Sequence, residues 1–476
     1  MRGIFLFILL LTSHVSSARD GYKIRVKLND RQDTVVYLAY YFGKPLPTIF
    51  KTDSARLDRN GEAVFENKNK ITGGIYIVLP ADRTAWFEML IDNGAEFSVN
   101  ATLSSLPESV KFTGSPENSD FNDYHKLLKR HNEERQQLME HLAVHTTKED
   151  SNRVSERLNV LHSEQKDWRK DYIKKHPDRL LSAIYSALQT PEIPEGPHLK
   201  PDGSVDSQFA WRYYKSHFWN GFNFNDDRLI HTPLYDNKLS EYFNKVLPQH
   251  PDSVIAEADS LLHKVKGAEN LFKYSLNWLS TNAQTSQVMG MDKVFVHLVD
   301  NYYMKGDATW LSETELAKYI DRAKKIAPNI INNPAPDLSV LDVNNRPLKL
   351  SQFNAQHTLL IFYDPDCGHC KKEIPVIDSL YRAELKARGV RVFAFNVEVE
   401  EEKWRKFIEE KNLQDWTHVW DPQRRSRYWA LYDVQATPSL FLLDSNKIIR
   451  AKRLNHENIL KAVEISERQI NSEKKE

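Results

Sequence analysis

The chain has 476 residues, several times the length of a typical domain, so we expect two to four separate hydrophobic cores. Lysine and arginine together number 65, as do aspartate and glutamate, which leaves no net charge when the histidines are neutral. This balance does not favour nucleic acid or a strongly anionic surface as the partner. It leaves small and peptide-like partners open.

The N-terminus has the pattern of a secretory signal peptide. A basic start at Arg2 is followed by a short apolar run at 4–11, and small residues end the segment at Ala18. The run is about half as long as the roughly 20 residues that a membrane-spanning helix needs, which argues against an anchor. We therefore assign residues 1–18 to a signal peptide and expect cleavage before Arg19. The mature protein should be soluble and reside in the periplasm.

Residues 19–115 have the pattern of short, half-buried strands. Polar and apolar side chains alternate at 23–28, and further short strand-like stretches lie at 34–38 and 75–79. Tight-turn signals lie between such stretches at Asn60-Gly61 and Asn93-Gly94. The pattern predicts a small antiparallel β-sandwich or barrel, in which we identify no cluster of catalytic side chains.

From residue 116 the hydrophobic period becomes that of helices. Ser119 or Asp120 is placed to cap a first helix, and a second apolar stripe follows, as in a helical hairpin. A proline-rich break at 191–201 leads into an aromatic-rich region and further helical stretches. We predict a mainly α-helical domain over residues 116–332. Packing in a core, rather than a ligand groove, is the preferred interpretation of its aromatic residues.

The remaining segment, 333–476, contains two cysteines in an α/β pattern. A buried strand at 358–363 leads to Cys367-Gly368-His369-Cys370 and then to a helix. Further along lie a buried strand, a charged helix and another strand, at 390–395, about 400–411 and 439–443. The order strand, CxxC, helix within a β-α-β pattern is that of a thioredoxin fold. We therefore predict a C-terminal thioredoxin fold in a multidomain protein.

The two cysteines are expected to form a redox-active pair. They are the only cysteines of the chain, and a loop this short restricts the unfolded chain too little to staple a large protein. At the mouth of the helix, Cys367 would face unpaired backbone N–H groups and the positive end of the helix dipole, which favour its thiolate. We expect Cys367 to attack a substrate disulfide and the more sheltered Cys370 to resolve the mixed disulfide.

Two neighbouring side chains are candidates for tuning this pair. His369 adds positive charge near the thiolate, which stabilises the dithiol and moves the pair toward the oxidising end of the thioredoxin range. Glu373 lies three residues after Cys370 and hence on the same side of the helix, where an acid can shuttle the proton of Cys370. A surface glutamate that continues the polar run Lys371-Lys372 fits the spacing of Glu373 equally well.

Four motifs in this segment resemble the TlpA/ResA branch of the thioredoxin superfamily over about residues 333–470: Pro336-Asp337, Leu350-Ser351-Gln352-Phe353, the run 367–375 and Ala436-Thr437-Pro438. The resemblance implies that the bond between Thr437 and Pro438 is cis and faces the cysteines, so that its backbone can pair with an extended substrate. It also implies that Glu373 is the acidic residue of that branch, and that the protein reduces its substrates. His369, in contrast, favours oxidation or isomerisation.

Two positions depart from the pattern of this branch, and the residues before 333 show a second, looser resemblance. Asp364-Pro365-Asp366 replaces a tryptophan-containing approach to the first cysteine, and Ile361 stands in place of the buried aspartate of ordinary thioredoxins. Substrate preference therefore does not carry over. The residues before 333 resemble, more loosely, the β and helical modules that precede such domains in exported Bacteroidetes-type proteins.

The sequence thus predicts an exported thiol:disulfide oxidoreductase that acts on protein thiols and disulfides. Because the chain has no second cysteine pair, it needs a separate redox partner, for which we expect a membrane-borne reductant. We expect no cofactor and no metal, since Cys367, His369 and Cys370 are too closely spaced to wrap a tetrahedral ion.

Two alternatives stay open. The long N-terminal part keeps open a binding or assembly protein with a vestigial redox domain. A peroxiredoxin-type thiol peroxidase is the other alternative, but that chemistry normally needs a hydroxyl residue three positions before the cysteine, where this chain has Asp364.

Overall fold

The computed structural model describes residues 20–144 and 147–473, so the assigned signal peptide lies outside the described residues. The chain forms two compact units. The first contains the residues up to Leu247 together with Leu262–Tyr274, and the second contains Pro248–Leu261 together with the residues from Ser275 onward. No described helix combines the length and the apolar character needed to cross a membrane.

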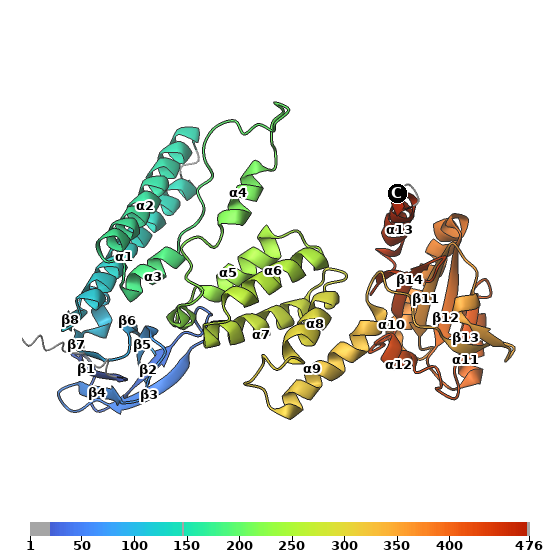
Figure 1. Ribbon diagram of the computed structural model, residues 1–476, viewed down its shortest axis with the longest axis horizontal. Helices are drawn as coiled ribbons and strands as arrows, with labels where there is room; N and C mark the ends of the chain where they lie inside the picture. The colour runs from blue at the N-terminus through green and yellow to red at the C-terminus, as the bar shows by residue number, and fades with distance from the viewer. Residues whose placement is uncertain (1–19, 145–146, 474–476) are drawn as a thin grey trace, which may run out of the picture. The chain divides into compact units, whose positions relative to one another are not determined.

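The N-terminal residues form a β-sandwich of two four-stranded sheets (Figure 1). The strands are β1 (Tyr22–Leu28), β2 (Val35–Tyr40), β3 (Phe50–Arg56), β4 (Glu62–Asn67), β5 (Gly74–Pro80), β6 (Phe87–Ile91), β7 (Ala95–Ala101) and β8 (Lys111–Thr113). One sheet has the order β4-β1-β7-β8 and the other β3-β2-β5-β6. All these pairings are antiparallel except that of β1 with β7, which is parallel.

The predicted sandwich is confirmed by the core between the sheets. Alternate residues of β1, such as Ile24 and Val26, are buried there together with Val36 and Leu38 of β2. Side chains that alternate with these on β1 are more exposed, because successive residues of a strand point to opposite faces.

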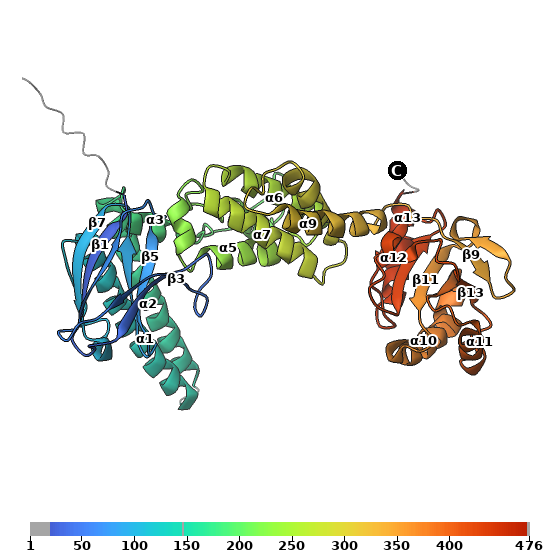
Figure 2. The same ribbon diagram turned by 90° about the horizontal axis from the view of Figure 1, so that it is seen from below.

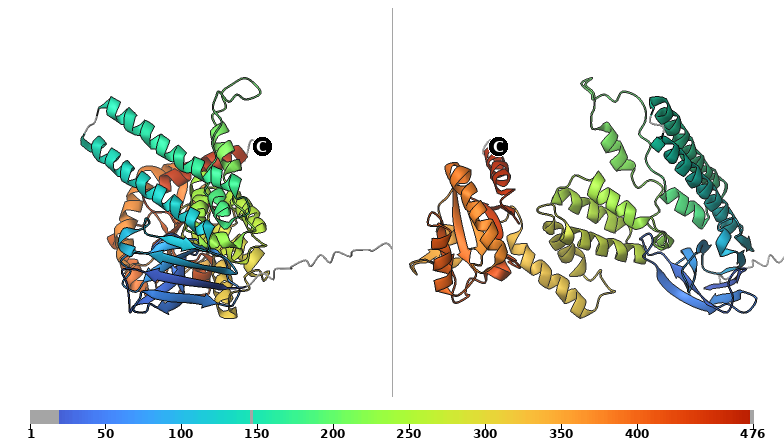
Figure 3. Two further views of the ribbon diagram at one scale, coloured as in Figure 1. Left: turned by 90° about the vertical axis from the view of Figure 1, so that its left-hand side faces the viewer. Right: turned by 180° about the vertical axis from the view of Figure 1, so that it is seen from behind.

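The middle of the chain is mainly helical, as predicted. Its helices are α1 (Pro116–Val144), α2 (Lys148–Lys175), α3 (Leu180–Ala187), α4 (Phe209–His217), α5 (Tyr235–Glu241), α6 (Pro251–Lys264), α7 (Glu269–Thr285), α8 (Asp292–Leu298) and α9 (Glu313–Ile326). The long helices α1 and α2 form the predicted hairpin (Figure 3). The predicted cap at Ser119 or Asp120 is wrong, because α1 begins at Pro116. Proline suits a first helical position, since its φ is already helical and no N–H is lost.

The C-terminal residues form one seven-stranded sheet in the order β10-β9-β13-β12-β11-β14-β15. Its strands are β9 (Ser339–Asp342), β10 (Pro347–Lys349), β11 (His357–Tyr363), β12 (Val390–Asn396), β13 (Thr417–Trp420), β14 (Ser439–Asp444) and β15 (Ile449–Lys452). Strands β11, β12 and β13 are parallel, and β14 runs antiparallel to β11. The helices are α10 (Gly368–Leu380), α11 (Glu401–Glu410), α12 (Tyr428–Leu431) and α13 (Ile459–Glu473).

Both faces of this sheet are covered, which explains the continuous apolar run of β11. Leu359 and Ile361 pack with residues of α10, α11 and α13, whereas Leu360 and Phe362 enter a second core with Tyr432. Figure 2 shows α10 and α11 beside each other on one side of the sheet. The predicted thioredoxin fold is confirmed, and β13, β15 and α13 complete it.

Candidate active site

A tight turn carries the chain from β11 to the two cysteines. Strand β11 ends at Tyr363, and the backbone N–H of Cys367 donates to the carbonyl of Asp364 at 3.2 Å. Cys367 is the N-cap residue of α10, with φ −67° and ψ 124°, and its carbonyl accepts from the N–H of Lys371 at 3.0 Å. Its thiol therefore lies at the carboxyl end of a central strand and at the positive end of a helix.

The two thiols have different surroundings. Cys367 is partly exposed, whereas Cys370 is 0% exposed and packs in the core with Tyr363 and Ile374. An incoming sulfur atom can therefore reach Cys367 but not Cys370.

The same surroundings separate the acidities of the two thiols. The pKa of Cys367 is lowered, first by a hydrogen bond from the side chain of Thr437 and then by the backbone N–H groups of Cys370 and His369. Burial, in contrast, raises the pKa of Cys370 to about 12. At neutral pH Cys367 is thus the group that supplies a thiolate.

Thr437 and Pro438 meet the cysteines from the start of β14. The bond between them is cis, as the resemblance implies. The Sγ of Cys367 donates to the carbonyl oxygen of Thr437 at 3.3 Å, so this backbone lies directly beside the exposed thiol.

Glu373 has a partner that the sequence did not reveal. Its side chain is 21% exposed, and Oε1 accepts from the backbone N–H of His456 at 2.7 Å. The Nδ1 atom of the same histidine lies 2.9 Å from both carboxylate oxygens. In the described part of the chain, Glu373 and Cys370 share no hydrogen bond. His456 follows β15, 83 residues along the chain, so no local pattern could have paired it with Glu373.

His369 is exposed, and its side chain forms no hydrogen bond or ion pair with another described residue. Its backbone N–H nevertheless contributes to the low pKa of Cys367.

A buried network lies at the end of β11, close to Cys370. The indole N–H of Trp404 donates to the hydroxyl oxygen of Tyr363 at 2.7 Å, and that hydroxyl lies 3.1 Å from Nδ1 of His418. Nε2 of His418 lies 2.9 Å from the carbonyl of Leu413. Burial lowers the pKa of His418 to about 4, so the ring is neutral and donates through Nε2. The network satisfies these buried groups without placing a charge beneath Cys370.

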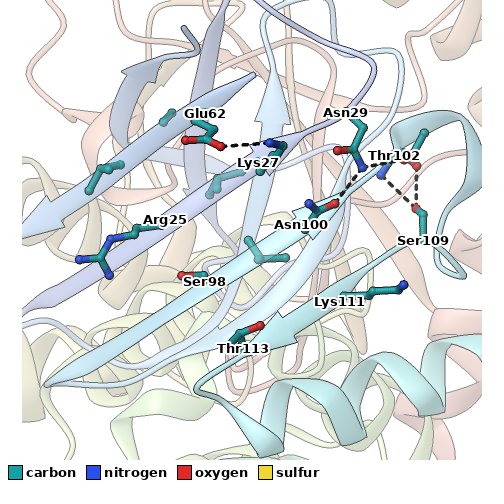
Figure 4. Close-up of a pocket in the computed structure, with 14 residues that line it drawn as sticks. Arg25, Lys27, Asn29, Glu62, Ser98, Asn100, Thr102, Ser109, Lys111 and Thr113 are labelled. Carbon is teal, nitrogen blue, oxygen red and sulfur yellow. Dashed lines mark hydrogen bonds and ion pairs between the residues drawn. The ribbon is translucent and has the colours of Figure 1, made fainter. Parts of the chain in front are cut away.

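A separate hollow of about 660 Å³ lies on the outer face of the sheet β4-β1-β7-β8 (Figure 4). Lys27 and Glu62 pair across it at 3.0 Å, and Asn29 donates to Asn100 at 2.8 Å. Several of its polar side chains thus bind one another, and its lining includes no cysteine or histidine. Within residues 20–144 and 147–473, no group of three or more His, Cys, Asp or Glu residues is arranged to hold a metal.

Comparison with known families agrees with this geometry. Residues 331–452 match the AhpC/TSA family. These residues form a thioredoxin-like domain. Residues 143–329 and 22–121 match two families described as domains of unknown function, DUF5106 and DUF4369.

Individual relatives match about a quarter to a third of the chain. Methylamine utilization protein MauD of Paracoccus denitrificans is 32% identical over 26% of this chain and 60% of its own length. Thiol-disulfide oxidoreductase ResA of Geobacillus kaustophilus is 28% identical over 24% of this chain and 64% of its own. The chain thus spans less than two thirds of the length of these relatives. A solved domain of a possible thiol-disulfide isomerase from Cytophaga hutchinsonii is 35% identical and is covered to 99%, over 31% of this chain, with a TM-score of 0.29.

Proposed function

We propose that the protein is a thiol:disulfide oxidoreductase that exchanges disulfides with protein substrates through Cys367 and Cys370. The observation that carries the proposal is the inequality of the two thiols. Cys367 is accessible and has a lowered pKa, whereas Cys370 is buried and has a pKa of about 12. Disulfide reduction needs one exposed nucleophile and one protected resolving thiol.

The reaction follows from these positions. The thiolate of Cys367 attacks one sulfur of a substrate disulfide, the substrate S–S bond breaks, and the departing thiolate takes up a proton. Cys370 then loses its proton and attacks the Sγ of Cys367, which releases the second substrate thiol after it too is protonated. The substrate gains two electrons and two protons, and the cysteine pair becomes a disulfide.

The second step requires a base for Cys370, and we assign this role to Glu373. The carboxylate is half-buried on the same helix, and His456 holds it in place.

The substrate is proposed to bind beside Thr437 and Pro438. The Thr437 backbone lies within 3.3 Å of the attacking sulfur, so an extended substrate segment that pairs there brings its disulfide to Cys367. His369 is exposed between the two cysteines, and it is proposed to contact the bound substrate as well.

We further propose that the protein is exported to the periplasm and that reduction is its physiological direction. The chain has two cysteines only, so each turnover leaves the pair oxidised and a separate, membrane-borne reductant must restore it. N-terminal sequencing of the protein recovered from the periplasm tests the export step, with Arg19 as the expected first residue.

Insulin reduction by the full chain, with dithiothreitol as the recycling reductant, tests the activity. The wild type should accelerate precipitation of the insulin B chain, and Cys367→Ser should abolish the acceleration. Equal rates for the two proteins would favour the alternative of a binding protein with a vestigial redox domain. Peroxide consumption by the same preparation tests the peroxidase alternative. The reduction potential of the Cys367/Cys370 pair, measured against glutathione, tests whether reduction or oxidation of substrates is the physiological direction.

A further inference from the structure

Four large side chains are exposed on the segment that joins β13 to α12 and on the first turn of α12. Arg424, Arg425 and Arg427 are exposed, and the side chain of Trp429 is 42% exposed although tryptophan is usually well buried. We call residues 424–429 the arginine loop.

The arginine loop lies at the same edge of the sheet as Cys367. Tyr428, inside the loop, stacks on Phe362 with ring centroids 5.6 Å apart and contacts Phe395 at 4.7 Å. These two phenylalanines are the penultimate residues of β11 and β12, whose parallel carboxyl ends share one edge. Only three residues separate the end of β11 from Cys367.

The three guanidinium groups form no hydrogen bond or ion pair within the described part of the chain. Three acidic residues, Asp364, Asp421 and Glu398, act electrostatically on Tyr428 of the loop. Asp364 accepts from the backbone N–H of Asp366 at 2.7 Å, and Asp421 accepts from the backbone N–H of Ser426 at 2.6 Å. The loop thus presents three exposed guanidinium groups at the edge of the sheet that carries Cys367.

The backbone conformation at two of these arginines is one that other residue types adopt with less strain. Arg424 and Arg427 have φ values of 52° and 51°, in the left-handed region where glycine, asparagine and aspartate are less strained. Arginine and tryptophan, in turn, are the residue types most enriched among the dominant contacts of protein interfaces.

We propose that the arginine loop binds an acidic segment of the client protein that flanks the disulfide to be reduced. The inference rests on the proposed oxidoreductase function and adds the class of substrate. Carboxylates of the client pair with the three arginines, and an apolar side chain packs on Trp429. Charge complementarity of this kind raises the rate of encounter and selects among partners.

The test compares three disulfide substrates of the full chain: two peptides that differ only in having glutamates or lysines beside the disulfide, and uncharged hydroxyethyl disulfide. The wild type should reduce the acidic peptide with a kcat/KM about tenfold above that of the basic peptide at low salt, as expected for three exposed ion pairs. The preference should shrink as salt is added. In a variant with Arg424→Gln, Arg425→Gln and Arg427→Gln, the two peptides should react at equal rates.

Two controls make the result specific. Arg468→Gln removes an exposed arginine of α13 and should keep the full preference for the acidic peptide. Arg468 lies two residues after Ser466, which contacts His357 at the end of β11 opposite to Cys367. Hydroxyethyl disulfide should be reduced equally by all variants, which shows that they are folded.

The outcomes separate the two proposals. Turnover of all three substrates by the wild type without preference between the peptides would overturn the docking proposal and leave the oxidoreductase function standing. Failure of the wild type to reduce any of them would instead overturn the proposed function. Arginine-dependent binding to phosphatidylglycerol vesicles, without peptide preference, would assign the loop to a membrane surface and overturn the inference.

Discussion

Replacing Cys367 with serine should leave a chain whose remaining thiol is almost unreactive. Burial, which the substitution preserves, is the largest cause of the raised pKa of Cys370, which is about 12 in the wild type. At pH 8 about one Cys370 in ten thousand is then a thiolate, whereas about one in four free cysteines is, given their pKa of about 8.5. The thiolate population is therefore lower by roughly a thousandfold, and the complete burial of the side chain slows the reaction further.

The assay is alkylation by iodoacetamide at pH 8, followed by mass spectrometry of the intact chain. Cys370→Ser, which retains the exposed thiol, should be modified at least about a hundredfold faster than Cys367→Ser. In concentrated urea the two variants should react at equal rates, because the difference comes from the fold. Alkylation of folded Cys367→Ser at a rate within tenfold of Cys370→Ser would refute the reasoning.

Three further predictions concern neighbouring groups. Thr437→Val removes the side-chain hydrogen bond that contributes most to the low pKa of Cys367. The curve of insulin-reduction rate against pH should therefore shift toward alkaline pH. An unshifted curve would show that the Thr437 hydroxyl has no role. Glu373→Gln should slow release of the mixed disulfide in stopped-flow measurements while circular dichroism stays unchanged, and a wild-type release rate would leave Glu373 as a structural residue. Asp292→Asn should lower the free energy of unfolding in urea by about 3 kcal/mol, because it leaves the ammonium of Lys452, 5% exposed, without its counter-ion. Asp292→Leu combined with Lys452→Met should cost less, because it leaves no buried charge and only the two Asn329 oxygens that Lys452 binds without their donor.

Features that depend on local pattern could be predicted from the sequence. The apolar run 358–363 is long enough for one buried strand, and the cysteine spacing that follows it suits the first turn of a helix. The half-buried alternation predicted for residues 23–28 is confirmed in β1, because the side-chain period of a strand is a property of the segment itself.

Features that depend on distant contacts could not be predicted. The partner of Glu373 lies 83 residues away, and the parallel pairing of β1 with β7 joins strands separated by five others in the chain. The start of α1 differs from the prediction for a local reason, because Ser119 and Asp120 are good capping residues but Pro116 is itself favoured at a first helical position.

The pKa of Cys370 illustrates both kinds of feature. Its position three residues after Cys367 indicated that it is the sheltered member of the pair. The extent of its burial arises from packing between α10 and the sheet, which brings Tyr363 and Ile374 around the sulfur. The sequence order therefore assigns the roles, and the tertiary packing separates the two acidities.

The most direct test of the central claim is mixed-disulfide trapping with the full chain. Cells that express Cys370→Ser or Cys367→Ser are quenched in acid, alkylated and analysed on non-reducing gels. The account predicts that Cys370→Ser accumulates adducts with client proteins through Cys367, and that Cys367→Ser accumulates none. Adducts with Cys367→Ser alone would reverse the two roles, and the absence of adducts from both variants would contradict disulfide exchange as the function of the pair.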